Sequence, residues 1–220
     1  MLNSNLALFD KIARLFNKHG FKLFMVGGTS RDFLLGHVVL DFDFTTDATP
    51  EEMEKFLPDA NYRFKEFGTV SLKEDGKLIE ITTLRQEGNY IDFRHPGHIK
   101  FVREPHLDYI RRDFTINALY INEKYEVLDF CDGLKDLKTK TLRVIGDPYA
   151  RFEEDPLRII RAFRFIAKFN LDIDPLTDNA IRDLAPLVKK LNPDKIRQEI
   201  RKVGEEEQLT FKKLMNIYKL

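Results

Sequence analysis

The sequence lacks the features that mark several large classes of protein. Its 220 residues contain a single cysteine, which excludes a disulfide-stapled scaffold and suits a reducing compartment. No uninterrupted apolar run approaches the roughly 18 residues that a membrane span needs, and residues 1–5 show no basic region leading into an apolar stretch. Neither sign of charge is in excess, because 36 Lys and Arg balance 36 Asp and Glu. We therefore expect a soluble, cytoplasmic protein without a membrane partner.

The hydrophobic residues that are present, 43% of the chain, follow the periods of both helices and strands. Apolar residues at helical spacing predict a helix over residues 5–19. Alternation of apolar and acidic residues over 40–44 predicts a strand with one buried face. Strands over 69–73 and 77–84 flank the turn pair Asp75-Gly76 and predict a hairpin. The first part of the chain therefore belongs to the α+β class, with a mixed or antiparallel sheet.

The rest of the chain has a different pattern, because strand signals stop after residue 145. Helical periodicity follows and is interrupted by prolines at positions 175, 186 and 193. We predict three regions: an α+β domain over residues 1–145, an all-α domain over 146–205, and the start of a further helical region over 206–220, which looks cut off.

Two acidic residues on a predicted strand are the first candidates for chemistry. Asp41 and Asp43 are one residue apart, so both carboxylates are expected on one face of the strand. The apolar residues beside them, Leu40, Phe42 and Phe44, are expected in the core. Two neighbouring carboxylates repel each other unless a cation lies between them, and Mg²⁺ prefers oxygen ligands of this kind. For the pair taken alone, a solvated polar face remains the alternative.

A glycine bend precedes this pair along the chain. The apolar run over 23–26 ends at Gly27-Gly28, and a helix is expected to follow with Thr29 and Ser30 as its caps. Because Gly28 lets the backbone approach a ligand, and free amide groups at a helix start lie beside Arg31, the bend suits a phosphate. Combined with metal-binding acids, it describes a site for a triphosphate. A plain strand-to-helix turn is the alternative reading of the bend alone.

A third acidic residue lies on the predicted hairpin. Glu80 is flanked by Ile79 and Ile81, so its side chain faces away from theirs. A strand next to the acidic pair could supply Glu80 as a further metal ligand or as a base. An exposed strand glutamate is the alternative.

Several segments together resemble one protein family more closely than any single motif does. They are FMVGGTSRDFLLG at 24–36 with DFD at 41–43, RRDFTINAL at 111–119, and RFEEDPLRIIRAFRF at 151–165. In this order they resemble the class II, or bacterial-type, tRNA nucleotidyltransferase and poly(A) polymerase family of the polymerase-β-like superfamily. The resemblance covers about residues 24 to 200 and implies a polymerase-β-like head domain followed by a helical neck.

The resemblance implies roles for individual residues. Asp41 and Asp43 would bind the catalytic metal ions, and Glu80 falls where the family often carries a third carboxylate. The implied reaction is attack by an RNA 3′-hydroxyl on the α-phosphorus of a nucleoside triphosphate, with Mg²⁺ as cofactor and pyrophosphate leaving. The implied nucleotide contacts are Gly28, Arg31, Arg112, Asp155, Arg158, Arg161 and Arg164.

Base choice also has a physical account. Asp155 and Arg158 are three apart on a predicted helix, which places an acceptor beside a donor fork. Cytosine and adenine both present an amino donor next to a ring-nitrogen acceptor, whereas uracil and guanine carry oxygen in place of that donor. The pair could therefore accept C and A and refuse U and G. Arg161 continues along this side, whereas Arg164 lies nearly opposite and its role rests on the resemblance.

The function implied is addition of C and A to the 3′ end of tRNA from CTP and ATP, with no protein partner. The alternatives are a poly(A) polymerase, a CC-only or A-only enzyme, and a noncatalytic nucleotide- or RNA-binding fragment. Family members usually continue through further helical domains, so we expect a truncated chain. Phe93, in a charged loop expected over 84–97, replaces a usual glycine of the family.

Overall fold

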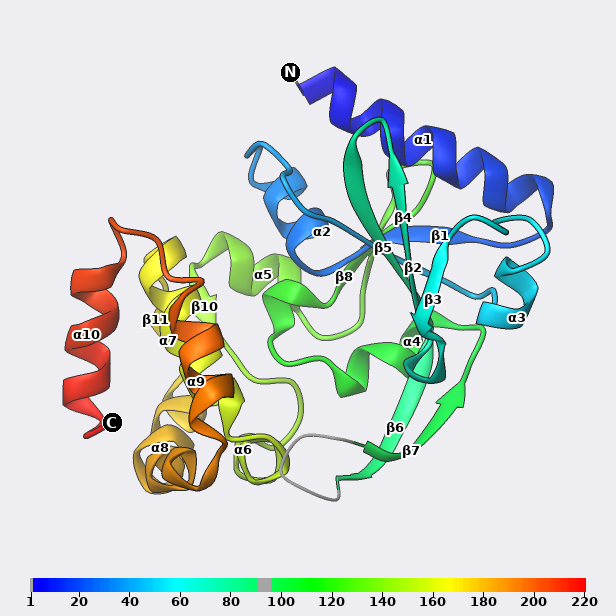
Figure 1. The fold of residues 1–220 in the computed structure, drawn as a ribbon. Coiled ribbons are helices and arrows are strands. Elements are labelled where there is room, and N and C mark those ends of the chain that lie inside the picture. Colours follow the sequence, from blue (N-terminus) through cyan, green and yellow to red (C-terminus); the bar gives the residue numbers. More distant parts are fainter. Residues whose placement is uncertain (1, 91–95) are drawn as a thin grey trace. The chain divides into compact units, whose positions relative to one another are not determined.

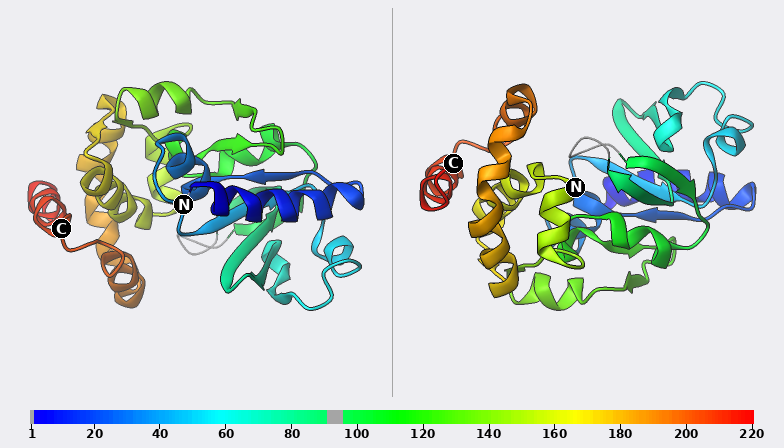
Figure 2. Two further views of the ribbon diagram at one scale, coloured as in Figure 1. Left: turned by 90° about the horizontal axis from the view of Figure 1, so that it is seen from above. Right: turned by 90° about the horizontal axis from the view of Figure 1, so that it is seen from below.

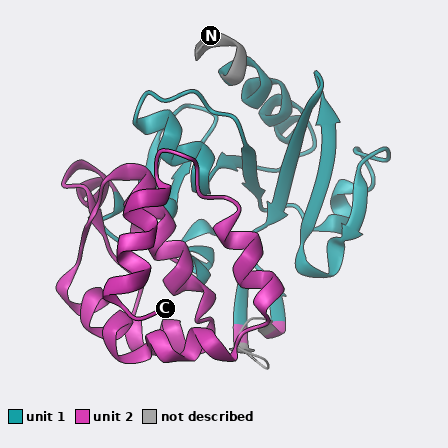
Figure 3. Ribbon diagram, turned by 60° about the vertical axis from the view of Figure 1, so that its left-hand side comes forward, with its two compact units in different colours: residues 1–87, 99–112, 116–133 teal, residues 88–98, 113–115, 134–220 magenta. Residues whose placement is uncertain are grey.

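The structure, a computed structural model, describes residues 2–90 and 96–220 (Figure 1). Internal contacts divide it into two compact units, which Figure 3 colours separately. Within the described ranges, unit 1 comprises residues 1–87, 99–112 and 116–133, and unit 2 comprises 88–98, 113–115 and 134–220. The sequence-based division near residue 146 into separate domains stays a prediction. No helix in the described part of the chain is both long and apolar enough to cross a lipid bilayer.

Unit 1 is built on a seven-stranded sheet with the strand order β3-β4-β5-β2-β1-β8-β9. The central pair β2 and β5 is parallel, and the other neighbours are antiparallel. The predicted α+β class with a mixed sheet is therefore confirmed. The strands are β1 (Leu23–Met25), β2 (Phe42–Thr46), β3 (Asn61–Phe64), β4 (Thr69–Glu74), β5 (Lys77–Thr83), β8 (Leu119–Ile121) and β9 (Val127–Asp129).

Helix α1 (Leu2–Lys18) runs along the sheet of unit 1 (Figure 2). Its apolar residues Phe9, Ile12 and Phe16 recur at helical spacing and are fully buried. The ring of Phe9 lies 5.3 Å from that of Phe44 on β2, so this helix covers the inner part of the sheet. The shorter helical elements of unit 1 are α2 (Gly27–Leu34), α3 (Pro50–Met53), α4 (Pro105–Asp108) and the 3-10 turns at Lys65–Phe67 and Tyr109–Arg111.

The hairpin predicted around Asp75-Gly76 is confirmed as β4 and β5. Asp75 and Gly76 have φ values of 51° and 75°, the left-handed conformations that a tight hairpin turn requires. Strand β5 therefore follows β4 directly in the chain. It pairs with β4 along one edge and with β2 along the other.

Two local expectations about unit 1 are wrong. Leu40 is 80% exposed rather than buried, because β2 begins only at Phe42, where pairing with β5 starts. Thr29 and Ser30 do not cap α2, which begins at Gly27. Their hydroxyl groups bond elsewhere, since that of Thr29 donates to the carbonyl of Asp41 and that of Ser30 to the carbonyl of Gly27.

Three short strands lie where none was expected. Strands β6 (Arg85–Tyr90) and β7 (Pro96–Phe101) form a two-stranded sheet in place of the expected loop over 84–97. The remainder of that segment, with Phe93, lies outside the described residues. In unit 2, β10 (Thr141–Leu142) pairs in parallel with β11 (Asp172–Ile173), although only helix was predicted after residue 145.

Unit 2 is otherwise helical, and α7 packs against α6, α9 and α10 (Figure 2). The predicted interruptions are confirmed, because α8 and α9 begin at Pro175 and Pro193 and a 3-10 helix follows Leu184. Asp174 and Asn192 cap the two α-helices through their side chains. The elements are α5 (Gly133–Lys138), α6 (Pro148–Glu154), α7 (Leu157–Phe169), α8 (Pro175–Leu184), a 3-10 helix (Ala185–Lys190), α9 (Pro193–Ile200) and α10 (Gln208–Ile217).

Candidate functional site

Two of the predicted acidic residues lie side by side at the centre of the sheet of unit 1. Asp43 on β2 is the direct register partner of Glu80 on β5. The flanking Phe42 and Ile79 are buried, so by strand alternation both carboxylates leave the opposite face. Asp41 is exposed and precedes β2 by one residue. The structure thus brings Asp43 together with Glu80 on adjacent strands and places Asp41 at their edge.

The glycine bend predicted to approach a ligand lies against Asp43. Gly27 has a φ of +66°, and a Cβ built on it would lie 3.6 Å from Asp43 Oδ2. The Thr29 hydroxyl donates to the carbonyl of Asp41 at 2.9 Å and accepts from the backbone N–H of Asp43 at 2.7 Å. The start of α2 is therefore fastened to β2, which holds the bend and the carboxylate at a fixed separation.

The Asp43 carboxylate is held in an unfavourable electrostatic environment. Burial, together with the negative charges of Glu80 and Asp41, raises the pKa of Asp43 to about 6, against the opposing charges of Arg112 and Arg31. The ionised form thus lacks full compensation within the protein. A cation beside Asp43 and Glu80 would supply it.

Among the residues that the structure describes, no three His, Cys, Asp or Glu side chains converge as a metal site. Asp43 and Glu80 together offer a two-carboxylate donor set. Hard divalent cations such as Mg²⁺ are held in this way when the substrate's phosphate groups and water complete the coordination. The residues present therefore fit a metal ion that binds with a phosphorylated substrate.

A cavity of about 180 Å³ is lined by Asp43 and Glu80 and by three arginines, Arg85, Arg111 and Arg112, which form its basic side. Arg112 was expected as a nucleotide contact, whereas sequence reasoning missed Arg85 and Arg111. Both residues lie next to predicted site residues in the sequence. Arg111 directly precedes Arg112, and Arg85 comes shortly after the strand that carries Glu80, so their positions could have suggested a role at the site. The remaining lining residues are Val26, Gly27, Phe44, Thr69 and Thr82.

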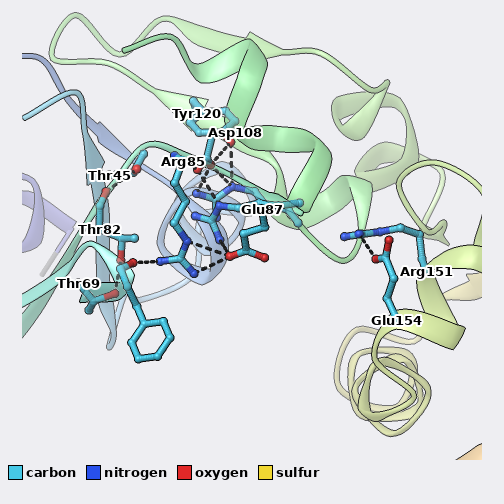
Figure 4. A network of polar contacts seen from close by, with 12 residues as sticks. Thr45, Thr69, Thr82, Arg85, Glu87, Asp108, Tyr120, Arg151 and Glu154 are labelled. Carbon is cyan, nitrogen blue, oxygen red and sulfur yellow. Dashed lines mark hydrogen bonds and ion pairs between the residues drawn. The ribbon is translucent and has the colours of Figure 1, made fainter. Parts of the chain in front are cut away.

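The three arginines are tied to two acidic residues, Glu87 and Asp108, which Figure 4 labels together with Arg85. Glu87 accepts from Arg85 Nε at 2.8 Å. Asp108 is fully buried and pairs with Arg111 and Arg112. Burial alone would raise the pKa of Asp108, but the charges of Arg111 and Arg112 outweigh it and hold that pKa well below its ordinary value.

Two further predicted nucleotide contacts of unit 1 lie at the bend. Gly28 lies close to both Arg31 and Asp43. A Cβ built on it would lie 3.6 Å from Arg31 Nη2 and 4.0 Å from Asp43 Oδ2. Arg31 is 4% exposed, and it donates through Nη1 to Asn117 Oδ1 at 2.6 Å and through Nε to Asp32 Oδ1 at 3.0 Å. These contacts hold Arg31 against Asn117 and Asp32, so it braces the start of α2.

The predicted base-recognition residues belong to unit 2. Asp155 was expected on the same helix as Arg158, but it ends α6, and α7 begins after Pro156. Proline disfavours helical geometry at the residue before it, which explains the break. Arg158 is 6% exposed and donates to the carbonyl of Arg151 at 2.9 Å and to Glu154 at 3.1 Å.

The other two arginines of α7 share a buried acidic partner. Arg161 Nε donates to Asp113 Oδ2 at 2.9 Å, and its Nη1 lies 3.9 Å from Glu199. Arg164 Nε lies 3.3 Å from Glu199 Oε2. Glu199, on α9, is only 5% exposed. Arg161 is thus paired with Asp113 and Glu199, and Arg164 with Glu199.

A carboxylate pair on adjacent strands, beside a glycine bend and facing arginines, defines a polymerase-β-like head domain. The comparison with family models agrees, since the poly(A) polymerase head-domain model matches residues 23–143. The chain belongs to the poly(A) polymerase head-domain family, and the resemblance expected from the sequence is confirmed.

Curated relatives and solved structures point the same way. The chain is 44% identical over 176 residues to the CCA-adding enzyme of Streptococcus mutans, a match that covers 80% of this chain and 44% of that protein. It is 36% identical over 192 residues to the CCA-adding enzyme of Bacillus licheniformis, covering 87% and 48%. The chain thus spans about half the length of the curated relatives it matches.

The fold is also similar to solved structures of such enzymes. The Bacillus stearothermophilus CCA-adding enzyme in complex with CTP has a TM-score of 0.82 at 31% identity, covering 91% of this chain and 49% of that one. The Thermotoga maritima CCA-adding enzyme complexed with tRNA has a TM-score of 0.77 at 29% identity, covering 97% and 50%.

Proposed function

We propose that this chain carries the nucleotidyl-transfer and base-selection sites of a CCA-adding enzyme. In this proposal it uses CTP and ATP to add C and A to the 3′ end of tRNA and releases pyrophosphate. The observation that carries the proposal is the cavity of about 180 Å³ that Asp43 and Glu80 line together with Arg85, Arg111 and Arg112. The names of the relatives support the choice of tRNA, CTP and ATP.

The arrangement suits a polyphosphate substrate in two ways. The guanidinium groups of Arg85, Arg111 and Arg112 can bond the β- and γ-phosphates, and the amide groups at the Gly27-Gly28 bend lie where α2 starts and can bond phosphate oxygens. Asp43 and Glu80, helped by Asp41 at their edge, would hold Mg²⁺. When bound, Mg²⁺ lowers the pKa of the attacking hydroxyl and neutralises charge on the departing pyrophosphate.

Each acidic residue then has a distinct task. The backbone of Asp43 is held by its hydrogen bond to the Thr29 hydroxyl. Because the pKa of Asp43 is raised, its ionised carboxylate is stabilised when a cation binds beside it. Glu80 is exposed on β5, so it can reach the attacking 3′-hydroxyl as ligand or base. Arg31 holds α2 in place through Asn117 and so keeps the bend aligned with the phosphates.

We assign base selection to unit 2. Asp155 offers an acceptor for the exocyclic amino group of cytosine or adenine, and Arg158 offers donors for the adjacent ring nitrogen. Asp113 and Glu199 fix Arg161 and Arg164 as further contacts to the nucleotide. In domain terms, residues 1–145 act as the catalytic head, 146–205 as the neck, and 206–220 begin a further helical region.

The setting proposed is the cytoplasm. The relatives process tRNA, and a lone cysteine suits a reducing compartment. No protein partner is needed for the chemistry at Asp43 and Glu80, since substrate and metal complete the site.

A product ladder tests the function. The chain is incubated with Mg²⁺, tRNA transcripts that end before CCA, and each nucleoside triphosphate in turn and in pairs. CCA addition gives two residues with CTP alone, a third when ATP is added, and none with UTP or GTP. A homopolymer with ATP alone identifies a poly(A) polymerase, and a stop after C or a single A identifies a partial enzyme. Tight CTP binding without pyrophosphate release at any RNA concentration identifies a noncatalytic fragment and contradicts the proposal.

A further inference from the structure

One carboxylate organises the whole basic side of the cavity. Asp108 ends α4 and is fully buried, so nothing in solvent competes for its two oxygens. Its partners come from three separate parts of unit 1, namely the start of β6, the turn after α4, and β8 (Figure 4).

The contacts divide between the two oxygens of the carboxylate. Oδ1 accepts from the backbone N–H of Arg85 at 2.9 Å and from Arg111 Nε at 2.8 Å. Oδ2 accepts from the Tyr120 hydroxyl at 2.6 Å, and from Arg112 through Nε at 3.0 Å and Nη2 at 2.9 Å. Asp108 therefore fixes two guanidinium groups directly and anchors the backbone from which the third extends.

The aromatic partner completes this arrangement. The Tyr120 hydroxyl also lies 2.8 Å from Arg112 Nε, and the guanidinium carbon of Arg112 lies 5.0 Å from the centre of the Tyr120 ring. Arg112 is thus held at its Nε edge and along one face of its plane. Arg112 also lines the cavity.

We infer that Asp108 is a positioning residue for the triphosphate, because it sets the directions in which Arg111 and Arg112 meet the phosphate groups and anchors the backbone of Arg85. This inference rests on the proposed function. Asp108 itself has no path to the substrate, since both of its oxygens are occupied and its side chain is buried. It acts through the arginines, which bind phosphate well only when their forked donors are already oriented.

The consequence is specific to the phosphates. An amide in place of the carboxylate keeps the size of the side chain but removes one acceptor and one charge, so it cannot bond both arginines. Arg111 and Arg112 would then lose their common anchor and spread over several conformations. Binding of the nucleoside part of CTP involves other residues and is expected to change little.

The test compares Asp108→Asn with a matched control elsewhere in the chain. Asp136 is also buried, at 1% exposure, and its Oδ2 accepts from Arg143 Nε at 3.0 Å and from the Thr115 hydroxyl at 2.7 Å. Asp136→Asn therefore removes a similar buried carboxylate that does not line the cavity. The dissociation constants of CTP and CMP are measured by calorimetry for each variant, after circular dichroism has shown that it is folded.

The quantity to compare is the ratio of the CMP dissociation constant to that of CTP. We expect Asp108→Asn to lower this ratio about tenfold, which corresponds to the loss of one well-oriented charged hydrogen bond, and Asp136→Asn to leave it unchanged. A folded Asp108→Asn protein with the wild-type ratio, or an equal fall in both variants, overturns the inference.

A second variant covers the case in which Asp108→Asn does not fold. Tyr120→Phe keeps the ring over Arg112 and removes only the hydroxyl, so a fall in the ratio of about threefold is expected; an unchanged ratio overturns the inference. If wild-type protein adds C to RNA from CTP while the variants keep the wild-type ratio of dissociation constants, only this inference fails. If wild-type protein does not prefer CTP to CMP, the proposed function fails with it.

Discussion

Replacing Asp43 with asparagine should make the protein more stable while abolishing its activity. The pKa of Asp43 is raised from an ordinary 3.8 to about 6, chiefly by burial and then by the charges of Glu80 and Asp41. Between these two pH values the native state binds more protons than the unfolded state, so stability falls as pH rises from about 4 to about 6. Above that range the deficit is constant.

The size of the effect follows from the shift. A rise of about two pKa units, at 1.36 kcal/mol per unit, corresponds to about 3 kcal/mol of native-state stability lost on ionisation. Asp43→Asn removes the charge and keeps the shape, so the variant should gain up to this amount at pH 7 and almost nothing at pH 3.5. Relaxation around the carboxylate makes the figure an upper bound.

Urea denaturation at a series of pH values measures the difference directly. Asp59→Asn controls for the substitution itself, because Asp59 is exposed in a turn after α3. The reasoning is refuted if wild type and Asp43→Asn differ by the same free energy at pH 3.5 and pH 7, or if the variant is the less stable at pH 7.

Three further substitutions probe the parts around this carboxylate. Gly27→Ala forces a side chain into a backbone conformation at φ +66° and should cost about 1 kcal/mol of unfolding free energy; an unchanged urea midpoint would count against the strained bend. Thr29→Val removes the hydroxyl that joins the carbonyl of Asp41 to the N–H of Asp43, and should cost about 1–3 kcal/mol in the same assay; no loss would show that the bond is dispensable. Asp155→Ala should raise incorporation of UTP relative to CTP about tenfold in a primer-extension assay without changing Mg²⁺-dependent CTP binding, and retained selectivity would remove Asp155 from base recognition.

The parts of the fold that could be predicted depend on neighbours in the sequence. The Asp75-Gly76 turn dictates its own hairpin, because both residues tolerate a left-handed backbone. Pro175 and Pro193 start helices because each lacks the N–H that a first turn leaves unpaired, and the preceding residues cap them. The period-two pattern around Asp43 likewise placed its carboxylate on one face of a strand.

The errors occur where strand pairing or a single proline decides the outcome. Leu40 continues the alternating pattern, but β2 pairs with β5 only from Phe42 onward, so nothing buries it. Asp155 shares a helical spacing with Arg158, but Pro156 separates them into different elements. In both cases the local period was correct and the extent of the element was not.

The basic side of the cavity could not be predicted from spacing. Asp108 bonds Arg85 and Tyr120, and these residues come together only through the packing of β6, α4 and β8. The parallel pairing that places Asp43 beside Glu80 is likewise a property of the sheet order, in which β5 lies next to β2. A sequence pattern identifies the candidate acids, and the topology decides which of them meet.

The central claim is that Asp43 and Glu80 take a metal-bound triphosphate. Calorimetric titration of CTP into wild type and Asp43→Asn, each with and without Mg²⁺, tests it most directly. The account predicts that Mg²⁺ tightens CTP binding to wild type at least about tenfold and leaves binding to the variant unchanged. An equal gain from Mg²⁺ in both proteins would contradict it.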